Sequence, residues 1–295
     1  MTMLEYQENY GTEDQCKQYL YEKRWPKGFV CPKCSHTECF NIQSRNLYQC
    51  KACNRQTSIT AGTIMDKTRT PLRKWFLALY LVGEDKRGIS ALALMKKIGV
   101  SYNTAWTMLS KIRHAMAERE NTYMLGGIIE MDEAFFGAPT EGGKRGRGTD
   151  KTAVLVSVCL TDEGKPGFAK MEVIEHVDSK AVTDFANGSI TKGSEIHTDG
   201  LKIYRPLAQE GYSLIQKKYD AKGNPEHLHW THIIVSNAKA FINGTFHGLG
   251  STHLQRYLDE FCYRFNRRWL VSGIFPKLVD AVARSSIIRN YELVR

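Results

Sequence analysis

The stretch CPKCSHTECFNIQSRNLYQCKAC, residues 31–53, decides the fold of the first part of the chain. Its cysteines form two Cys-x2-Cys pairs separated by residues 35–49, which is the spacing of a four-thiolate zinc ribbon. Each pair turns tightly enough to direct two sulfurs at one ion, and the residues between the pairs form a hairpin that joins them. We therefore predict a structural zinc site, with four buried structural cysteines as the alternative. Its ligands are Cys31, Cys34, Cys50 and Cys53.

The other cysteines argue against disulfide bonds. Cys16, Cys39, Cys159 and Cys262 show no regular framework, and no signal peptide precedes them. No apolar run reaches the length that a membrane helix requires. We expect a protein of the reducing cytoplasm with no membrane partner.

Charge is distributed unevenly along the 295 residues, which carry a formal net charge of +10 and 42% hydrophobic residues. Residues 1–120 carry +8, residues 121–252 carry −2 and residues 253–295 carry +4. Both ends of the chain can therefore hold a polyanion, because cationic side chains release counterions from phosphates. A polyanion partner is what this favours; a solvated basic surface is the alternative.

Helical patterns flank the ribbon. Residues 12–25 begin with capping residues and have helical spacing, and a second helix is expected to begin at Pro71. In residues 88–116, one helix capped by Ser90 is followed by a Gly-Val turn and a second helix capped by Ser101. This pattern predicts a helix-turn-helix, and a plain helical hairpin is the alternative.

The second helix of this motif carries side chains suited to DNA. Polar and aromatic groups at its start can read base edges in a major groove, and later cations can contact phosphates. The predicted DNA-binding residues here are Tyr102, Asn103, Thr104, Lys111 and Arg113.

The chain changes character after Gly126-Gly127. Three β-branched and aromatic runs separated by turn residues predict a strand meander. A helix, a short strand, a further helix, a strand and a last helix follow. This order predicts a ribonuclease-H-like domain, which is a mixed sheet flanked by helices. The ranges are strands at 128–137, 152–160, 168–177, 194–199 and 212–218, and helices at 179–190, 201–209 and 231–242.

Two aspartates occupy positions where this fold could use them for chemistry. Asp132 lies within the apolar run IIEMDEAFFG, and Asp199 ends the short strand in IHTDG. On adjacent strands the two carboxylates would form part of a Mg²⁺ or Mn²⁺ site, because these ions prefer oxygen ligands. Such ions support in-line phosphoryl displacement. The alternatives are a surface carboxylate at Asp132 and a turn residue at Asp199.

Several motifs together resemble a known family. The ribbon, the helix-turn-helix, MDEAFFG, GKRGRG, IHTDG, SNAKAFINGTFHG and YLDEFCYRFNRR occur in the order found in bacterial insertion-sequence transposases of the ISXO-like group. The resemblance covers residues 12–285. It implies a DDE-type recombinase that cuts at the ends of its own mobile element and joins the freed 3′ hydroxyls to target DNA. By motif match, Asp132 and Asp199 take the first two acidic positions.

The third acidic position departs from the wider DDE pattern, because no acid stands about 35 residues after Asp199. In the group that the chain resembles, asparagine takes this place, which points to Asn237, followed by Lys239. His232 lies seven residues before Lys239 on the same helix face and is the other candidate. Asn237 has a helix cap as its alternative role, and His232 a place in the core.

Further cations are predicted to contact DNA. Lys239 would hold a phosphate of the element end, and a glycine-rich loop with four cations could follow a bent backbone. Residues 257–268 place aromatics on one helix face beside arginines, which a core helix with a basic edge explains equally well. The predicted residues are Lys144, Arg145, Arg147 and Lys151 in the loop and Arg264, Arg267 and Arg268 in the helix.

We therefore expect a multidomain α+β protein with four parts: a leading helix and ribbon (1–65), a helix-turn-helix region (66–120), a catalytic domain (126–250) and a basic helical region (251–295). The predicted function is a transposase that binds DNA as a dimer or larger synaptic complex, in a bacterial cytoplasm at the nucleoid. The alternative is a catalytically decayed, domesticated DNA-binding protein or repressor.

Overall fold

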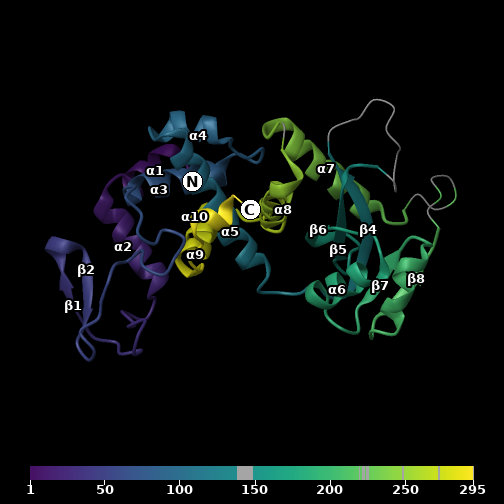
Figure 1. Cartoon of the computed structure of the whole chain (residues 1–295), viewed down its shortest axis with the longest axis horizontal. Coiled ribbons are helices and arrows are strands. Elements are labelled where there is room, and N and C mark those ends of the chain that lie inside the picture. The colour runs from purple at the N-terminus through teal and green to yellow at the C-terminus, as the bar shows by residue number, and fades with distance from the viewer. Residues whose placement is uncertain are drawn as a thin grey trace. The chain divides into compact units, whose positions relative to one another are not determined.

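The computed structural model divides the chain into two compact units (Figure 1). Unit 1 comprises Met1–Arg119 together with Trp269–Arg295, and unit 2 comprises Glu120–Arg268. The structure describes residues 1–137, 149–218, 220, 223, 226–247, 249–271 and 273–294.

Unit 1 is a helical body that carries the ribbon. Its aromatic core draws on helices far apart in the sequence: the ring of Tyr6 lies 4.5 Å from that of Tyr80 and 5.9 Å from that of Phe275. A helix near the C-terminus therefore completes a core formed by the first helices. The helices of unit 1 are α1 (Met3–Tyr10), α2 (Glu13–Arg24), α3 (Leu72–Glu84), α4 (Ala91–Ile98), α5 (Tyr102–Glu120, whose last residue opens unit 2), α9 (Phe275–Arg284) and α10 (Asn290–Leu293).

Local sequence signals set the ends of these helices. Thr12 and Gln15 form a capping box at the start of α2. Ser90 accepts a hydrogen bond from Ala93 N at the start of α4, and Gly99, with φ +63°, ends that helix in the left-handed conformation. The two predicted helices and the turn between them are therefore present as α4, the Gly99 turn and α5; that they form a DNA-binding helix-turn-helix and not a plain helical hairpin stays a prediction.

The ribbon is a small antiparallel sheet in the order β1-β2-β3. In the hairpin of β1 and β2, Cys39 lies opposite Cys50 and Ile42 opposite Leu47. The elements are β1 (Cys39–Ile42), the 3-10 turn η1 (Gln43–Arg45), β2 (Leu47–Cys50) and β3 (Gln56–Thr57). So short a sheet buries little apolar surface of its own, which leaves its stability to the metal site and to α2.

Unit 2 is a five-stranded mixed sheet in the order β6-β5-β4-β7-β8. β4, β5 and β6 pair antiparallel as a meander, whereas β7 runs parallel to β4 and β8 runs parallel to β7. The strands are β4 (Ile128–Phe136), β5 (Thr152–Leu160), β6 (Pro166–Ile174), β7 (Glu195–Thr198) and β8 (Ser213–Gln216). The predicted ribonuclease-H-like order of strands and helices is confirmed.

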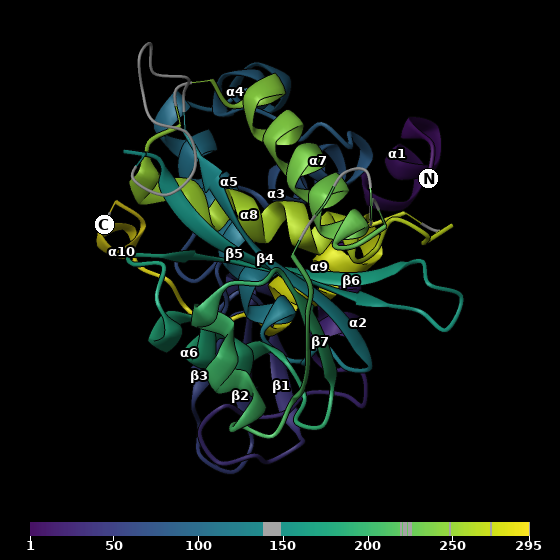
Figure 2. The ribbon, with the colours of Figure 1, turned by 90° about the vertical axis from the view of Figure 1, so that its right-hand side faces the viewer.

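Helices cover both faces of this sheet (Figure 2). Side chains of α7 and α8 form one hydrophobic cluster with β4, β5 and β6, and α6 and η2 form a second cluster on the opposite face. The helices are α6 (Ser179–Ser189), the 3-10 helix η2 (Lys202–Ala208), α7 (His229–Thr245) and α8 (Ser251–Phe265). Two apolar cores therefore stabilise the sheet, one on each face.

The compact units divide the C-terminal part differently from the predicted ranges. α8 packs on β6 in unit 2, whereas α9 packs on α2 and α3 in unit 1. The predicted basic region 251–295 is thus shared between the two units, because its helices bury their apolar faces in different cores. Among the described helices, none combines the length and apolar content needed to cross a membrane.

Candidate metal centres

The two cysteine pairs of the ribbon have the same local geometry. In the first, Ser35 N donates to Cys31 O at 2.9 Å, and in the second, Asn54 N donates to Cys50 O at 3.0 Å. Ser35 and Asn54 each follow the second cysteine of a pair and have φ values of +58° and +56°. A residue in the left-handed region closes each turn, so that both thiols of a pair project to the same side.

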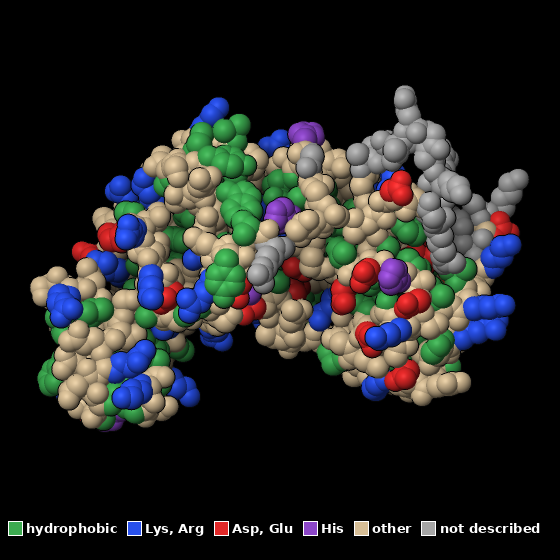
Figure 3. Space-filling view, viewed as in Figure 1, with side chains coloured by type: hydrophobic (Ala, Val, Ile, Leu, Met, Phe, Trp, Pro, Cys, Tyr) green, Lys and Arg blue, Asp and Glu red, His purple; other side chains and the backbone are tan. Residues whose placement is uncertain are grey.

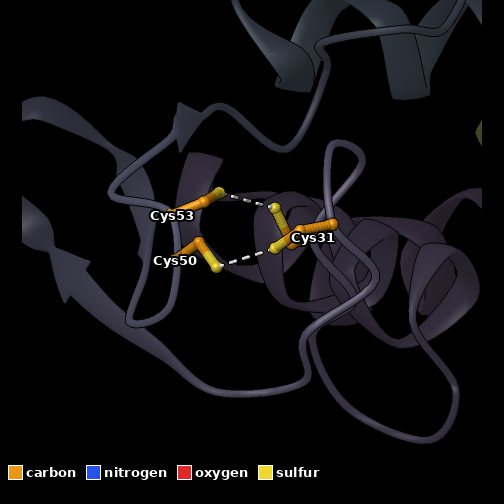
Figure 4. A group of neighbouring side chains, drawn as sticks. Cys31, Cys50 and Cys53 are labelled. Atoms are coloured by element: carbon orange, nitrogen blue, oxygen red, sulfur yellow. Dashed lines mark hydrogen bonds between the residues drawn. The ribbon is translucent and has the colours of Figure 1, made fainter.

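The four thiols converge on one point. Cys31 Sγ lies 3.6 Å from Cys53 Sγ, and Cys34 Sγ lies 3.6 Å from Cys50 Sγ (Figure 4). All four sulfurs lie within 4.8 Å of one another. Four sulfurs around a tetrahedral zinc ion at about 2.3 Å are about 3.8 Å apart, so this set fits zinc closely.

The second cluster lies where the middle of β4 passes the end of β7. The parallel register pairs Ile128 with Glu195 and Glu130 with His197. Continued by two residues, this register brings Asp132 beside Asp199, immediately beyond the end of β7. The structure thus brings the two predicted aspartates together, with ligand oxygens within 4.8 Å of each other.

A third carboxylate joins them that the sequence analysis missed. Glu133 follows Asp132 on β4, and its carboxylate lies within the same 4.8 Å cluster. Tyr204 of η2, which is fully buried, donates its hydroxyl to Glu133 Oε2 at 2.8 Å. Burial and the neighbouring carboxylate of Glu133 raise the pKa of Tyr204 well above its ordinary value, so that the hydroxyl keeps its proton.

Backbone amides orient the two aspartates. Glu133 N donates to Asp132 Oδ1 at 2.9 Å, and Leu201 N donates to Asp199 Oδ1 at 3.1 Å. The aspartates and Glu133 are all half-buried. Three carboxylates this close repel one another strongly unless a cation lies among them, and their oxygens are ligands that Mg²⁺ or Mn²⁺ accepts. The donor set therefore fits a hard divalent ion.

The two candidates for the third position occupy different sides of α7. His232 Nε2 lies 3.6 Å from Asp132 Oδ2. The Asp132 carboxylate raises the pKa of His232, against a smaller effect of burial. Asn237 is exposed and lies five residues further on, which is a rotation of about 140° around a helix. His232 therefore lies beside Asp132, and helix geometry turns Asn237 toward another side of α7.

Lys239 lies seven residues after His232 on the same side of α7. Its Nζ is 5.4 Å from the centre of the Phe136 ring at the end of β4. Burial and the charge of Lys151 lower the pKa of Lys239. Lys151 is therefore close enough to Lys239 to affect its pKa. The other predicted cations of the loop, Lys144, Arg145 and Arg147, lie outside the described residues.

The predicted DNA-contacting residues of α5 differ in exposure. Tyr102 is 51% exposed and Asn103 is also exposed, whereas Thr104 donates its backbone N–H to Ser101 Oγ at the helix start. Burial lowers the pKa of the half-buried Lys111, and Arg113 is only 3% exposed. The first turn is open to a ligand, but Arg113 is buried in unit 1.

The three predicted arginines of the YLDEFCYRFNRR motif have internal partners. Arg264 Nη2 lies 2.7 Å from Glu260 Oε1, and both side chains are buried. Arg267 pairs with the buried Glu120 and stacks on Tyr263. Arg268 donates to Gly167 O at 3.1 Å and stacks on Phe265. These contacts are those expected of the alternative, a core helix with a basic edge. They engage the guanidinium groups with partners inside unit 2.

The two units differ in net charge. Unit 1 carries 23 Lys and Arg against 12 Asp and Glu, a net charge of +11, and unit 2 carries 18 against 19, a net charge of −1. Figure 3 shows Lys and Arg side chains spread over the visible face of unit 1 and a group of Asp and Glu side chains on unit 2. Attraction for a polyanion is therefore concentrated in unit 1.

Comparison with known families places both clusters in recognised domains. Residues 11–56 match the transposase zinc-ribbon domain, and residues 124–266 match the ISXO2-like transposase domain. A protein of transposable element ISH50 from Halobacterium salinarum, itself uncharacterized, is 28% identical over 239 residues. The alignment covers 74% of this chain and 76% of that relative.

Two solved structures show a distant likeness. One is the crystal structure of a pre-cleavage Mos1 transpososome, with a TM-score of 0.27, 12% identity and coverage of 68% of this chain and 75% of that one. The other is Mos1 transposase in a paired-end complex with the left transposon end, with a TM-score of 0.24, 10% identity and coverage of 72% and 79%. These scores are too low to support a structural argument.

Proposed function

Because this chain belongs to the ISXO2-like transposases, we propose that it binds the ends of an insertion sequence and catalyses metal-dependent strand cleavage and strand transfer. The observation that carries the proposal is the convergence of Asp132, Glu133 and Asp199 within 4.8 Å, from the middle of β4 and the end of the adjacent β7. These residues lie inside the range that matches the transposase domain.

Asp132 and Asp199 would hold Mg²⁺ or Mn²⁺. Such an ion, when bound, polarises the scissile phosphate and activates the attacking hydroxyl. By holding the ion, the carboxylates would keep the reacting groups in line. The attacking oxygen, from water in cleavage or from a 3′ hydroxyl in transfer, would give its proton to solvent and bond to phosphorus. At the same time the bond to the leaving 3′ oxygen breaks, and that oxygen takes up a proton. The backbone hydrogen bonds of Glu133 and Leu201 keep both aspartates oriented before DNA arrives.

His232 and Glu133 share the role of the third acid. The 3.6 Å separation of His232 Nε2 from Asp132 Oδ2 supports His232 over Asn237 for this role, and Glu133 would supply a carboxylate in place of the acid that α7 lacks. Tyr204 donates to Glu133 Oε2 and would help to hold this carboxylate in place. Lys239, on the same side of α7 as His232, would hold a phosphate next to the reacting bond.

Unit 1 would recognise the element ends. Its charge of +11 favours DNA, and the exposed side chains of Tyr102 and Asn103 stand at the start of the second helix of a helix-turn-helix pattern. Two ends must be joined to the target, so we propose a dimer or larger complex on DNA. Asn103→Ala should weaken binding to the terminal DNA about 10-fold while binding to unrelated duplex changes little; equal loss on both would contradict base reading.

The test of catalysis uses a duplex that carries the element's own terminal DNA. Asp132→Asn and Asp199→Asn should each lower strand cleavage and transfer by about 1,000-fold or more in Mg²⁺ and in Mn²⁺, because the ion loses an anionic ligand. Asp162→Asn, in the exposed turn between β5 and β6, is the matched control and should cleave normally.

The affinity of each variant for the terminal DNA distinguishes a loss of catalysis from a loss of DNA binding. Both catalytic variants should retain the affinity of the wild type for the terminal DNA in a gel-shift measurement. Normal cleavage by either variant refutes the assignment of the site. A wild-type protein that binds the ends and never cuts them is instead the decayed DNA-binding protein.

A further inference from the structure

The start of α7 is held by other elements rather than by its own cap. Leu228 occupies the N-cap position in the left-handed conformation, with φ +57°, and no side chain at that position bonds the first turn. A helix begins with backbone N–H groups that lack partners within the helix. An acceptor from elsewhere in the fold can therefore fix where α7 begins.

Glu130 of β4 is that acceptor. Its Oε2 accepts a hydrogen bond from Thr231 N at 2.8 Å and another from Thr231 Oγ1 at 3.1 Å. Both residues are buried, with exposures of 4% for Glu130 and 0% for Thr231. A buried carboxylate at a helix N-terminus is favoured by the amide it accepts from and by the helix dipole, so this contact is specific and strong.

A second contact ties the same segment to the neighbouring strand. His227 lies just before α7 and is 9% exposed, and its Nε2 lies 3.0 Å from Thr198 O. Thr198 is the last residue of β7 and directly precedes Asp199. The beginning of α7 is therefore bound to both strands that carry the catalytic aspartates.

The residue after Thr231 is His232. Asp132 lies two residues after Glu130, which places both on the same face of β4. We propose that Glu130 is a positioning residue: by holding Thr231 it sets the 3.6 Å separation between His232 Nε2 and Asp132 Oδ2. This inference rests on the proposed function, because it assigns His232 a part in the reaction.

A double-mutant cycle on the full-length, zinc-loaded protein tests this role. Glu130→Ala should lower kcat for cleavage of the terminal DNA about 10-fold and leave KM for that DNA unchanged, because the metal ligands misalign while DNA contacts persist. Glu130→Ala in a His232→Ala background should cost no further rate, since a residue that acts through His232 has nothing left to position. Glu130→Gln keeps an oxygen that accepts from Thr231 N and should recover most of the rate.

All rates are compared well below the melting temperature of the least stable variant, and Glu195→Ala, a half-exposed glutamate on β7, is the control. The proposal is overturned if Glu130→Ala cleaves at the wild-type rate, or if its effect multiplies with that of His232→Ala. Asp132→Asn separates the two claims. If that variant still cleaves, the proposed function fails; if it is inactive and Glu130→Ala is normal, only the role of Glu130 fails.

Discussion

The two metal-ligand clusters of this chain depend on their surroundings in opposite ways. In the ribbon, the ligands sit on two short turns and a sheet of a few residues, so the ion supplies much of the folding energy. In unit 2, the carboxylates stand on a five-stranded sheet with a hydrophobic cluster on each face. There we expect the fold to form without the ion, which would bind to a site that already exists.

The two clusters also differ in whether their ligands leave coordination positions open. Four thiolates at tetrahedral spacing form a closed shell that leaves no place for a substrate. The half-buried carboxylates of Asp132, Glu133 and Asp199 leave coordination positions open for water and phosphate oxygens. Loss of the first metal should therefore remove structure, and loss of the second should remove chemistry.

The largest expected effect on folding in this comparison is that of breaking the ribbon. Cys31→Ser should unfold residues 31–57 and weaken binding to the terminal DNA by about 10-fold to 100-fold, since a three-thiolate site loses much of its zinc affinity. Zinc content, limited proteolysis and gel-shift affinity measure it. Cys39→Ser alters a cysteine of the same hairpin outside the ligand set and should change none of these.

Unchanged DNA affinity after loss of zinc would show that the ribbon serves another partner. Asp132→Asn provides the converse test, because it should leave zinc content intact and the melting temperature within about 2 °C of the wild type. A large loss of stability in that variant would contradict the independence of the two clusters.

A smaller effect is expected at the third position. His232→Ala should lower the cleavage rate about 10-fold and raise the Mn²⁺ concentration needed for half-maximal rate, because a side chain beside Asp132 is removed. Asn237→Ala, on another side of the same helix, should match the wild type. A greater loss in Asn237→Ala would reverse the assignment.

The smallest effect concerns the scaffold of unit 2 and depends on pH. Burial and the charges of Glu120 and Glu172 raise the pKa of Asp259 on α8 to about 7. A carboxyl whose pKa is raised by folding stabilises the protein while protonated, and this contribution is lost as pH rises through about 7.

Asp259→Asn should therefore raise the melting temperature by about 3–5 °C at pH 8 and leave it nearly unchanged at pH 4. Thermal unfolding at both values measures the difference. An equal shift at both pH values would mean that the substitution acts through packing and not through the proton.

Much of the architecture could be predicted because its signals are local. Cysteine spacing defines the ribbon, and the β-branched and aromatic runs of β4 and β5, bounded by turn residues, are enough to place Asp132 at mid-strand. The pairing of Asp132 with Asp199 followed from the order of elements, since β4 and β7 become parallel neighbours only in that fold.

Other parts depend on contacts that no single segment contains. Residues that follow one another in a strand point to opposite faces, so the sequence did not predict that the carboxylate of Glu133 would join those of Asp132 and Asp199. The two adjacent acids of the MDE sequence were the signal that could have indicated it. Helix spacing left His232 and Asn237 open until β4 and α7 were placed together. By contrast, the ion pair of Glu260 with Arg264 could be predicted from the sequence, because residues four apart lie on one helix face.

The central claim is that Asp132 and Asp199 share one divalent ion. Anomalous scattering from crystals of the zinc-loaded protein grown with Mn²⁺ tests it most directly. We predict a manganese peak within about 2.3 Å of an oxygen from each aspartate, with the zinc peak confined to the four cysteines. Manganese bound elsewhere, or at one aspartate without the other, would contradict the account.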